Sequence, residues 1–271
     1  MIDTHIHLWR RADAKQSGIL ARPYLQRDIL WDDYRAVWGG EQVEKAVQVQ
    51  VNDFVDPLWE AAFAAGIAES EPGLGAYVTW AALEQPYLDD ELDDLEPLHL
   101  VRGVRRTCQF EKDPEFCASK AYIRGARRLG ERGLLCEICV RLEQIVALPR
   151  LVRACPETVF VLQHLGKPDL GRPPEPGWLR AVEELGALPN VHCKLSPVVH
   201  TDADPHSGVE MVAPFVEHLL DCFGRERLLY GSNWPVAEAV VGYAEWVGIV
   251  RELVGADEAV FTGNARRLYR L

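Results

Sequence analysis

Residues 1–10, MIDTHIHLWR, have the pattern of a buried β-strand. Side chains alternate along a strand, so Asp3, His5 and His7 are expected to share one face. The opposite face is expected to be mostly apolar, formed by Ile2, Thr4, Ile6 and Leu8. This first strand therefore predicts one face that packs into the protein and one that carries groups suited to chemistry.

Seven further short apolar segments follow this strand. They are AVQVQV (46–51), GAYVTWAAL (75–83), VRGVRR (101–106), LLCEICV (134–140), VFVLQHLG (159–166), NVHCKLS (190–196) and RLLYGSNWP (227–235). Helical spacing of apolar residues marks the stretches between most of them, for example 57–70, 121–133, 143–155, 178–188 and 212–224. Strands that alternate with helices predict a parallel sheet.

Eight such units in 271 residues favour a closed (β/α)8 barrel of the TIM type over an open doubly wound sheet. Neither a linker nor a low-complexity tract divides the chain. We therefore predict a single α/β domain over residues 1–271.

The composition limits the partners that the chain would bind. Its net charge of −12, from 29 Lys and Arg against 41 Asp and Glu, disfavours nucleic acid and favours a small molecule. No window reaches the roughly 20 apolar residues that cross a bilayer, so no membrane partner is expected. The chain has no pattern of a secretory signal, which predicts a cytoplasmic location. Homo-oligomerisation is left open by the sequence.

Two features that resemble sites are interpreted as structural. The acidic run LDDELDDLEP (88–97) is typical of a solvated helix face. Seven cysteines, an odd number, indicate reduced thiols rather than a disulfide framework. Cys136 and Cys139 are three apart in a strand-like run, so their sulfurs are expected on opposite sides, where they cannot easily share a metal.

A barrel predicts where chemistry takes place, because such enzymes build their sites at the carboxyl ends of the strands. The polar residues expected at these ends are His5, His7, Arg102, Arg105, Glu137, His164, Lys194, Ser196 and Asn233. We expect them to converge on one mouth.

Four segments carry a family resemblance: DTHIHLW (3–9), LQHLGKPD (162–169), HCKLS (192–196) and LLYGSNWPV (228–236). In this order they resemble the amidohydrolase superfamily, specifically its amidohydrolase-2 branch. The resemblance is strongest to sugar-acid lactonases of the L-fuconolactonase and L-rhamnono-lactonase type, with pyrone-dicarboxylate lactonase more distant. It implies a distorted (β/α)8 barrel and the hydrolysis of a small lactone, derived from a sugar acid.

Opening a lactone requires attack of water on an ester carbonyl, a base for its proton, and groups that stabilise the developing oxyanion. We expect His5, His7 and His164 to be catalytic, polarising the carbonyl directly or through one divalent metal such as Zn²⁺. His5 and His7 share a strand face and can share a metal, and His164 from another strand would complete the ligands. The branch includes members that act without a metal, so the ion is expected to be weakly bound or dispensable.

Three charged residues are candidates for substrate binding: Arg105, Lys194 and Glu137. Arg offers a planar fork to a carboxylate and Lys a mobile charge, which suits an anionic or polyhydroxylated substrate. Alternation within VRGVRR decides whether Arg105 faces inward, and the alternative is a set of surface arginines. Glu137 either faces inward near Lys194 or pairs with Arg141.

Asn233 departs from the family pattern, because the related lactonases usually have Asp in this place as the base. An amide cannot accept the proton at neutral pH and is a weaker metal ligand. Three interpretations follow: His164 or Glu137 serves as the base, the substrate or reaction differs, or the protein binds without much turnover. The alternatives to a lactonase are thus a metal-dependent decarboxylase of the same fold and a ligand-binding protein.

The segment SPVVHTDADPHSG (196–208) follows the seventh predicted strand and contains a polar cluster, namely His200, Asp202, Asp204 and His206. Such a loop either covers the mouth or is simply solvated. His200 and Asp202 are the best placed to contact a substrate.

Overall fold

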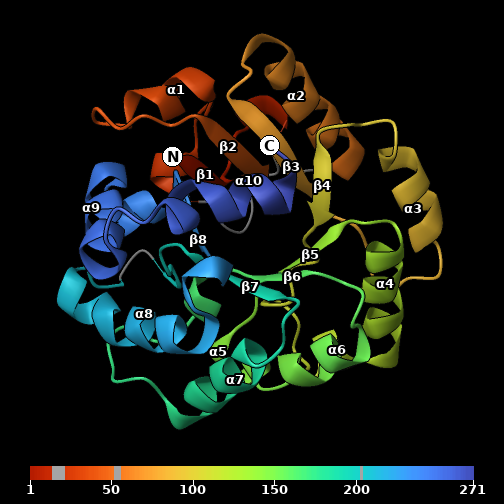
Figure 1. The fold of residues 1–271 in the computed structure, drawn as a ribbon. Helices are drawn as coiled ribbons and strands as arrows, with labels where there is room; N and C mark the ends of the chain where they lie inside the picture. The colour runs from red at the N-terminus through yellow and green to blue at the C-terminus, as the bar shows by residue number, and fades with distance from the viewer. Residues whose placement is uncertain (14–21, 52–55, 202–203) are drawn as a thin grey trace.

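The computed structural model describes residues 1–13, 22–51, 56–201 and 204–271. In this part of the chain eight strands form one sheet in sequence order, and every ladder is parallel. The strands are β1 (Ile2–Ile6), β2 (Lys45–Val49), β3 (Leu74–Thr79), β4 (Val101–Val104), β5 (Leu135–Ile138), β6 (Phe160–Leu162), β7 (Val191–Leu195) and β8 (Leu228–Tyr230). Figure 1 shows the strands at the centre with helices around them. The predicted (β/α)8 barrel is confirmed.

Individual bonds bring β1 and β8 together and nearly close the barrel. The Thr4 hydroxyl donates to the Tyr230 carbonyl at 2.6 Å, and the His7 N–H donates to the Trp234 carbonyl at 2.9 Å. Ile6 and Trp234 form an isolated parallel bridge. This junction agrees with the distorted barrel that the family resemblance implies.

The helices alternate with the strands and cover the outside of the barrel. They are α1 (Trp31–Ala36), α2 (Pro57–Ser70), α3 (Leu88–Leu95), α4 (Lys120–Glu131), α5 (Leu142–Ile145), α6 (Leu148–Ala154), α7 (Pro176–Gly186), α8 (Val209–Phe223), α9 (Tyr243–Val254) and α10 (Asn264–Tyr269). The prediction of one helix over 143–155 is wrong, because the helix is interrupted between α5 and α6. Pro149 lies in the first turn of α6, where its missing N–H costs nothing, whereas inside a continuous helix it would remove a bond.

The acidic run forms α3, as the sequence predicts. Its leucines at positions 88, 92 and 95 are buried, whereas Asp89 faces out and pairs with Arg128 at 2.7 Å. Charge on the outer face and leucine on the inner face make α3 an amphipathic surface helix.

The cysteines also follow the prediction, since all seven are free thiols. Cys136 packs in the large cluster between sheet and helices, and burial raises the pKa of its thiol. Cys139 instead places its sulfur 3.5 Å from Oε1 of Gln109. The two thiols therefore belong to different environments.

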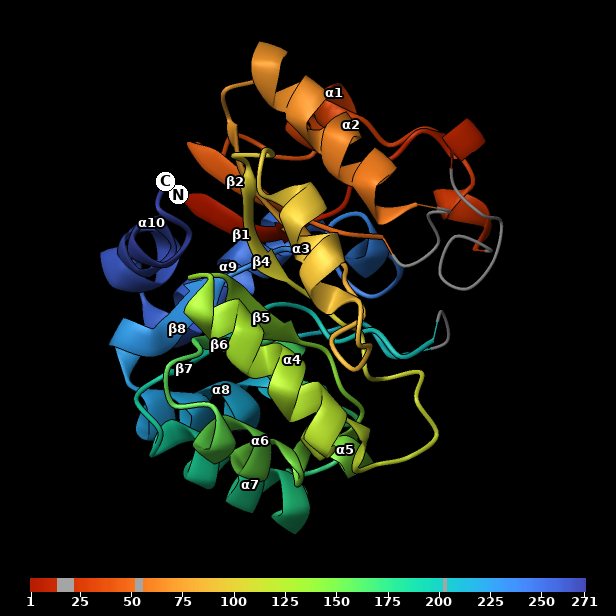
Figure 2. The same cartoon turned by 90° about the vertical axis from the view of Figure 1, so that its right-hand side faces the viewer.

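A small apolar cluster fills the barrel interior. It includes Ile2, Val49, Val78, Val161 and Leu229, and α10 contributes Ala265 and Tyr269. Figure 2 shows α10 near the amino terminus, at the end of the barrel where the strands begin. The C-terminal helix thus covers this end, and the opposite end remains for a site.

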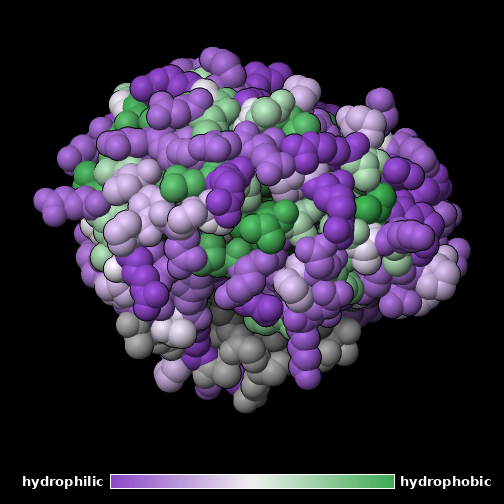
Figure 3. Space-filling model, turned by 90° about the horizontal axis from the view of Figure 1, so that it is seen from below, coloured by the Kyte–Doolittle hydropathy of each residue, from purple (hydrophilic) through white to green (hydrophobic). Residues whose placement is uncertain are grey.

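The surface is mainly polar. Figure 3 shows one face on which hydrophilic residues predominate and hydrophobic residues occupy small areas between them. None of the described helices is both long and apolar enough to span a membrane.

A fully buried ion pair crosses the interior. The Lys194 ammonium of β7 lies 2.6 Å from Oε2 of Glu137 of β5, and both side chains are 0% exposed. Lys194 also donates to the Thr4 carbonyl at 2.7 Å, while Gln163 donates to Oε2 of Glu137 at 2.6 Å. The Tyr269 hydroxyl of α10 donates to the other carboxylate oxygen. These bonds connect β1, β5, β7, the end of β6 and the C-terminal helix.

We predict that Lys194→Met lowers the free energy of unfolding by about 3–5 kcal/mol, because it leaves the Glu137 carboxylate buried without its cation. The double variant Lys194→Met, Glu137→Gln keeps the acceptor for Tyr269 but removes the stranded charge. It should be less destabilised than the sum of the two single variants. Urea unfolding measures all three, and strictly additive effects would contradict the coupling.

Candidate active site

β1 brings His5 and His7 to the carboxyl end of the barrel, but the expectation that Asp3 shares their face is wrong. The β1–β2 register shifts between Asp3 and Ile6, and this irregularity breaks the alternation. Ile2 consequently packs in the barrel interior. The Asp3 carboxylate accepts a hydrogen bond from the Tyr34 hydroxyl of α1 at 2.9 Å. Asp3 thus supports the strand from outside instead of joining the histidines.

His5 and His7 form a buried pair, and the tautomer of His7 is defined by its partner. Nδ1 of His7 lies 2.7 Å from the Val49 carbonyl, which can only accept, so Nδ1 carries the proton and Nε2 a lone pair. Nε2 of His5 lies 3.2 Å from Nε2 of His7. Nδ1 of His5 is buried without a hydrogen-bond partner in the described part of the chain. These nitrogens provide lone pairs or donors that the protein leaves unused.

His164 reaches the same place from the end of β6 through an unusual turn. Residues 164–167 all have positive φ, with +52° at His164 and +53° at Lys167, and the left-handed conformation is uncommon outside glycine. The turn places the His164 ring 4.5 Å from that of His5, measured between centroids. Nδ1 of His164 lies 2.9 Å from the Ser196 hydroxyl. The three histidines predicted as catalytic are therefore neighbours.

All three histidines are held in the neutral form. Burial is the main cause that lowers the pKa of His5 and His164 well below 6.5 and that of His7 to about 3. The nearby cation of Arg105 lowers the pKa of each of them further. Neutral imidazoles at pH 7 can accept protons or ligate a metal, but they do not act as cations.

The side chain of Arg105 faces the barrel interior, which is one of the two orientations that alternation within VRGVRR (101–106) allows. Its guanidinium donates to Oε1 of Gln163 at 3.2 Å and to the Gln50 carbonyl, and its Nε is buried without a partner in the described residues. Burial lowers the pKa of Arg105, although it stays charged at neutral pH. Arg106 points the other way and pairs with Glu84 at 2.8 Å.

Glu137 and Lys194 face inward but bind each other. Lys194 lies on β7, two positions before Ser196, which directly follows the strand, so the pair lies deeper than the histidine that Ser196 contacts. The pairing of Glu137 with Lys194, rather than with Arg141, agrees with the inward alternative. Their contact with a substrate stays a prediction.

Asn233 is 4% exposed and has a φ of +53°, a region that asparagine tolerates. Its Nδ2 donates to the Pro197 carbonyl at 3.3 Å. Its side chain also hydrogen-bonds to His7 and thereby partly offsets the lowering of the His7 pKa. Asn233 is therefore part of the histidine cluster, and it places a neutral amide there.

Lys167 is a site residue that the sequence analysis did not assign. It is 8% exposed and donates from Nζ to Oε1 of Gln109 at 2.7 Å. Burial lowers its pKa, and the structure describes no carboxylate in an ion pair with it. The available signal was its place in LQHLGKPD, three residues after His164.

The loop cluster is mostly engaged elsewhere. Asp204 accepts hydrogen bonds from the backbone N–H groups of His200 and Thr201, and Nε2 of His200 lies 3.1 Å from the Pro168 carbonyl. His206 pairs with Glu245 at the surface. Asp202 lies outside the described residues.

The histidine pair fits two ligands of a zinc ion. Two nitrogens at 2.0–2.1 Å from one tetrahedral Zn²⁺ would be about 3.3 Å apart, close to the 3.2 Å between the Nε2 atoms of His5 and His7. Among the described residues, however, no three His, Cys, Asp or Glu side chains are arranged as a complete ligand set. The amide of Asn233 also provides no anionic ligand.

Comparisons with known proteins agree with this architecture. A family model described as Amidohydrolase matches residues 2–271. An L-fucono-1,5-lactonase of Burkholderia multivorans is 30% identical over 100% of this chain and 96% of its own length.

Two solved structures show the breadth of the fold. An amidohydrolase from Burkholderia multivorans with bound Zn has a TM-score of 0.87 and 27% identity, covering 100% of this chain and 99% of its own. A 5-carboxyvanillate decarboxylase from Sphingomonas paucimobilis has a TM-score of 0.67 and 14% identity, with the same coverage of both chains, and shares the fold.

We predict that the free energy of unfolding falls as the pH falls from 6.5. The imidazole of His7 binds a proton in this range in the unfolded chain, whereas in the folded protein its pKa of about 3 keeps it neutral. This contribution is complete above pH 6.5 and is lost progressively toward pH 3. His7→Asn, which keeps a donor for the Val49 carbonyl, should lose about 2 kcal/mol less than the parent between pH 6.5 and 4.5. Urea unfolding at several pH values measures the difference, and equal slopes would refute the assignment.

Proposed function

The chain belongs to the amidohydrolase family, and from this premise we propose that it hydrolyses a small lactone, with sugar-acid lactones as the first substrate class. The observation that carries the proposal is the cluster of His5, His7 and His164, neutral and buried beside the unpaired Nε of Arg105. A cluster that presents lone pairs and a cation to one point suits the attack of water on a carbonyl.

His164 is the proposed base. In the tautomer whose Nδ1–H donates to the Ser196 hydroxyl, Nε2 is free to accept the proton of the attacking water. Glu137 is the weaker candidate because Lys194, Gln163 and Tyr269 already donate to its two oxygens. Of the three interpretations of Asn233, we therefore favour the first, in which another residue serves as the base, and we assign that role to His164.

Arg105 and Lys167 are the proposed oxyanion-stabilising groups. Each is a buried cation that binds neutral oxygen acceptors, Gln163 for Arg105 and Gln109 for Lys167. Donors that are fixed before the reaction stabilise charge that develops on the carbonyl oxygen. Deeper in the barrel, Lys194 and Glu137 would act on the substrate mainly by fixing Gln163, which contacts Arg105.

A zinc ion would be held by His5 and His7. The sequence predicts His164 as the third ligand, but the lone pair on its Nε2 is the one that the proposed base uses, so we propose that His164 stays outside the ligand set. When bound, the ion would supply Lewis-acid polarisation of the carbonyl. The hydrogen bond from Nδ1 of His7 to the Val49 carbonyl orients that ring for ligation. Because the amide of Asn233 is a weaker ligand than a carboxylate, we propose weak affinity for the ion.

The remaining expectations from composition stand as proposals. We propose that the partner is a small molecule and that the chain does not bind nucleic acid, and the acidic net charge supports both. We also propose a cytoplasmic location. Homo-oligomerisation is left to measurement of the mass in solution.

We predict that the purified chain opens sugar-acid lactones and that His164→Asn lowers kcat about 100-fold or more, the usual contribution of a general base. Asparagine tolerates the left-handed φ of this position, so the turn should survive. His206→Asn removes a surface histidine outside the cluster and should leave the rate unchanged. Release of acid at neutral pH measures turnover, with chelator and with added zinc.

The same panel separates the alternatives. Release of carbon dioxide from an aromatic or unsaturated acid, without ring opening of any lactone, would identify a decarboxylase. An inactive parent that gains lactonase activity in Asn233→Asp would identify a ligand-binding protein that lacks its base. Either result would overturn the proposed function.

A further inference from the structure

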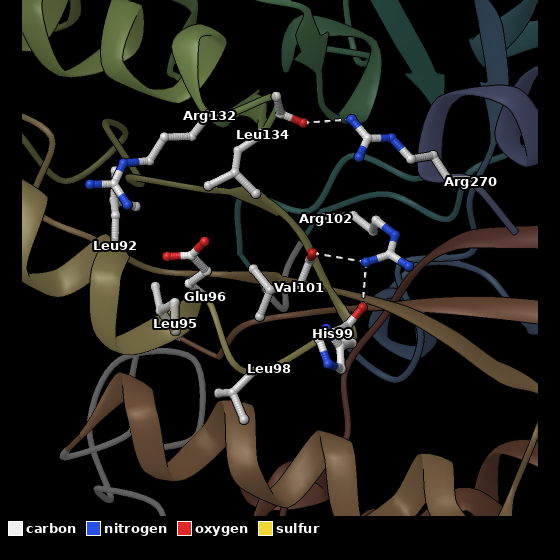
Figure 4. Close-up of a pocket in the computed structure, with 11 residues that line it drawn as sticks. Leu92, Leu95, Glu96, Leu98, His99, Val101, Arg102, Arg132, Leu134 and Arg270 are labelled. Atoms are coloured by element: carbon white, nitrogen blue, oxygen red, sulfur yellow. Dashed lines mark hydrogen bonds between the residues drawn. The ribbon is translucent and has the colours of Figure 1, made fainter.

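A cavity lies at the end of the barrel opposite the histidines. It has a volume of about 290 Å³ and is bordered by α3, the start of β4, the end of α4 and the residue after α10. Figure 4 shows Glu96, Val101 and Leu134 around a common space, with Arg102 and Arg270 on one side of it. This volume is at the lower limit for small-molecule sites, so an occupant would be small.

Two cations border this cavity without a carboxylate partner in the described part of the chain. Arg102 donates to the carbonyls of Tyr269, at 3.0 Å, and of His99 and Val101. Arg270 donates to the Gly133 carbonyl at 2.8 Å. Neutral carbonyls satisfy individual N–H groups but leave both positive charges uncompensated.

The two guanidinium groups are close enough to repel each other. Burial lowers the pKa of Arg102 first, and the charge of Arg270 lowers it further. By contrast Arg132, a third arginine of the lining, is neutralised by Asp93 at 2.6 Å. In a chain with a net charge of −12, two neighbouring uncompensated arginines form a local positive site.

The other wall of the cavity is aliphatic. Leu95, Leu98, Val101 and Leu134 line it, and Leu98 and Leu134 are only half-buried. Figure 4 shows Val101 and Leu134 next to the space beside the arginines, with Leu98 farther from them. An aliphatic wall next to cations suits a ligand with an apolar body and an anionic head. The carboxylate of Glu96 on the rim opposes an anion, and its removal therefore provides a test.

We propose that this cavity binds a small aliphatic carboxylate, with its head on Arg102 and Arg270 and its chain against the leucines. A guanidinium presents two parallel N–H groups that match the two oxygens of a carboxylate. The site is independent of lactone hydrolysis, because the histidine cluster lies at the other end of the strands. It does connect with the interior, since Arg102 binds the carbonyl of Tyr269, whose hydroxyl binds Glu137.

The test is a calorimetric titration of the full chain with hexanoate, hexanamide, acetate and inorganic phosphate. We expect hexanoate to bind at least about tenfold more tightly than each of the other three probes. Arg270→Gln should weaken hexanoate tenfold or more, whereas Glu96→Gln should strengthen it. Arg267→Gln makes the same change of charge on α10 outside the lining and should leave the affinity unchanged.

Leu98→Asn tests the aliphatic wall separately from the arginines, because it adds no charge, and it should also weaken hexanoate binding. Equal affinity of the parent and Arg270→Gln would overturn the assignment, as would the absence of hexanoate binding. Equal binding of phosphate or acetate would overturn its aliphatic part.

Discussion

The ammonium of Lys194 and the carboxylate of Glu137 lie 2.6 Å apart inside the barrel, and every strand that bears a catalytic candidate is tied to this pair or its partners. Lys194 donates a hydrogen bond to the carbonyl of Thr4 on β1, the residue before His5. Glu137 accepts a hydrogen bond from Gln163, which precedes His164. Gln163 in turn accepts a hydrogen bond from Arg105. A buried pair must be fully bonded to persist, so the same bonds that satisfy its charges fix the residues above it.

This constraint explains the electrostatic character of the mouth. The Glu137 carboxylate is bonded to Lys194 and to the Tyr269 hydroxyl, and the layer above it contains the cations Arg105 and Lys167 and three neutral imidazoles. Burial keeps the imidazoles neutral, and Arg105 reinforces the effect. Asn233 continues the pattern, because it places a neutral amide beside His7. These charges are consistent with the proposed stabilisation of developing negative charge and with the proposed weak affinity for a metal.

The sequence predicted the parallel barrel and the meeting of His5, His7 and His164, because the order of the strands decides both. It left the direction of Arg105 open. Its expectation that Arg102 lies at the same mouth is wrong, because Arg102 is at the start of β4 and bonds carbonyls at the opposite end of the barrel. It did not predict the place of Asp3, since a register shift between strands leaves no trace in a local pattern. It also missed Lys167, which a run of left-handed residues turns inward. Whether Glu137 would face a substrate or a lysine depended on contacts between distant strands, and on Tyr269 of the last helix.

The central claim is that water attacks the carbonyl of a lactone at the histidine cluster, and oxygen labelling tests it most directly. Sugar-acid lactones would be opened in ¹⁸O-water by the parent protein, with the His164→Asn variant as the blank. The acid that the parent forms in excess of the blank would be analysed by mass spectrometry. The account predicts one ¹⁸O per turnover in the carboxylate, with the ring oxygen retained as an unlabelled hydroxyl. Acid formation that does not exceed the blank, or label in the hydroxyl instead of the carboxylate, would contradict it.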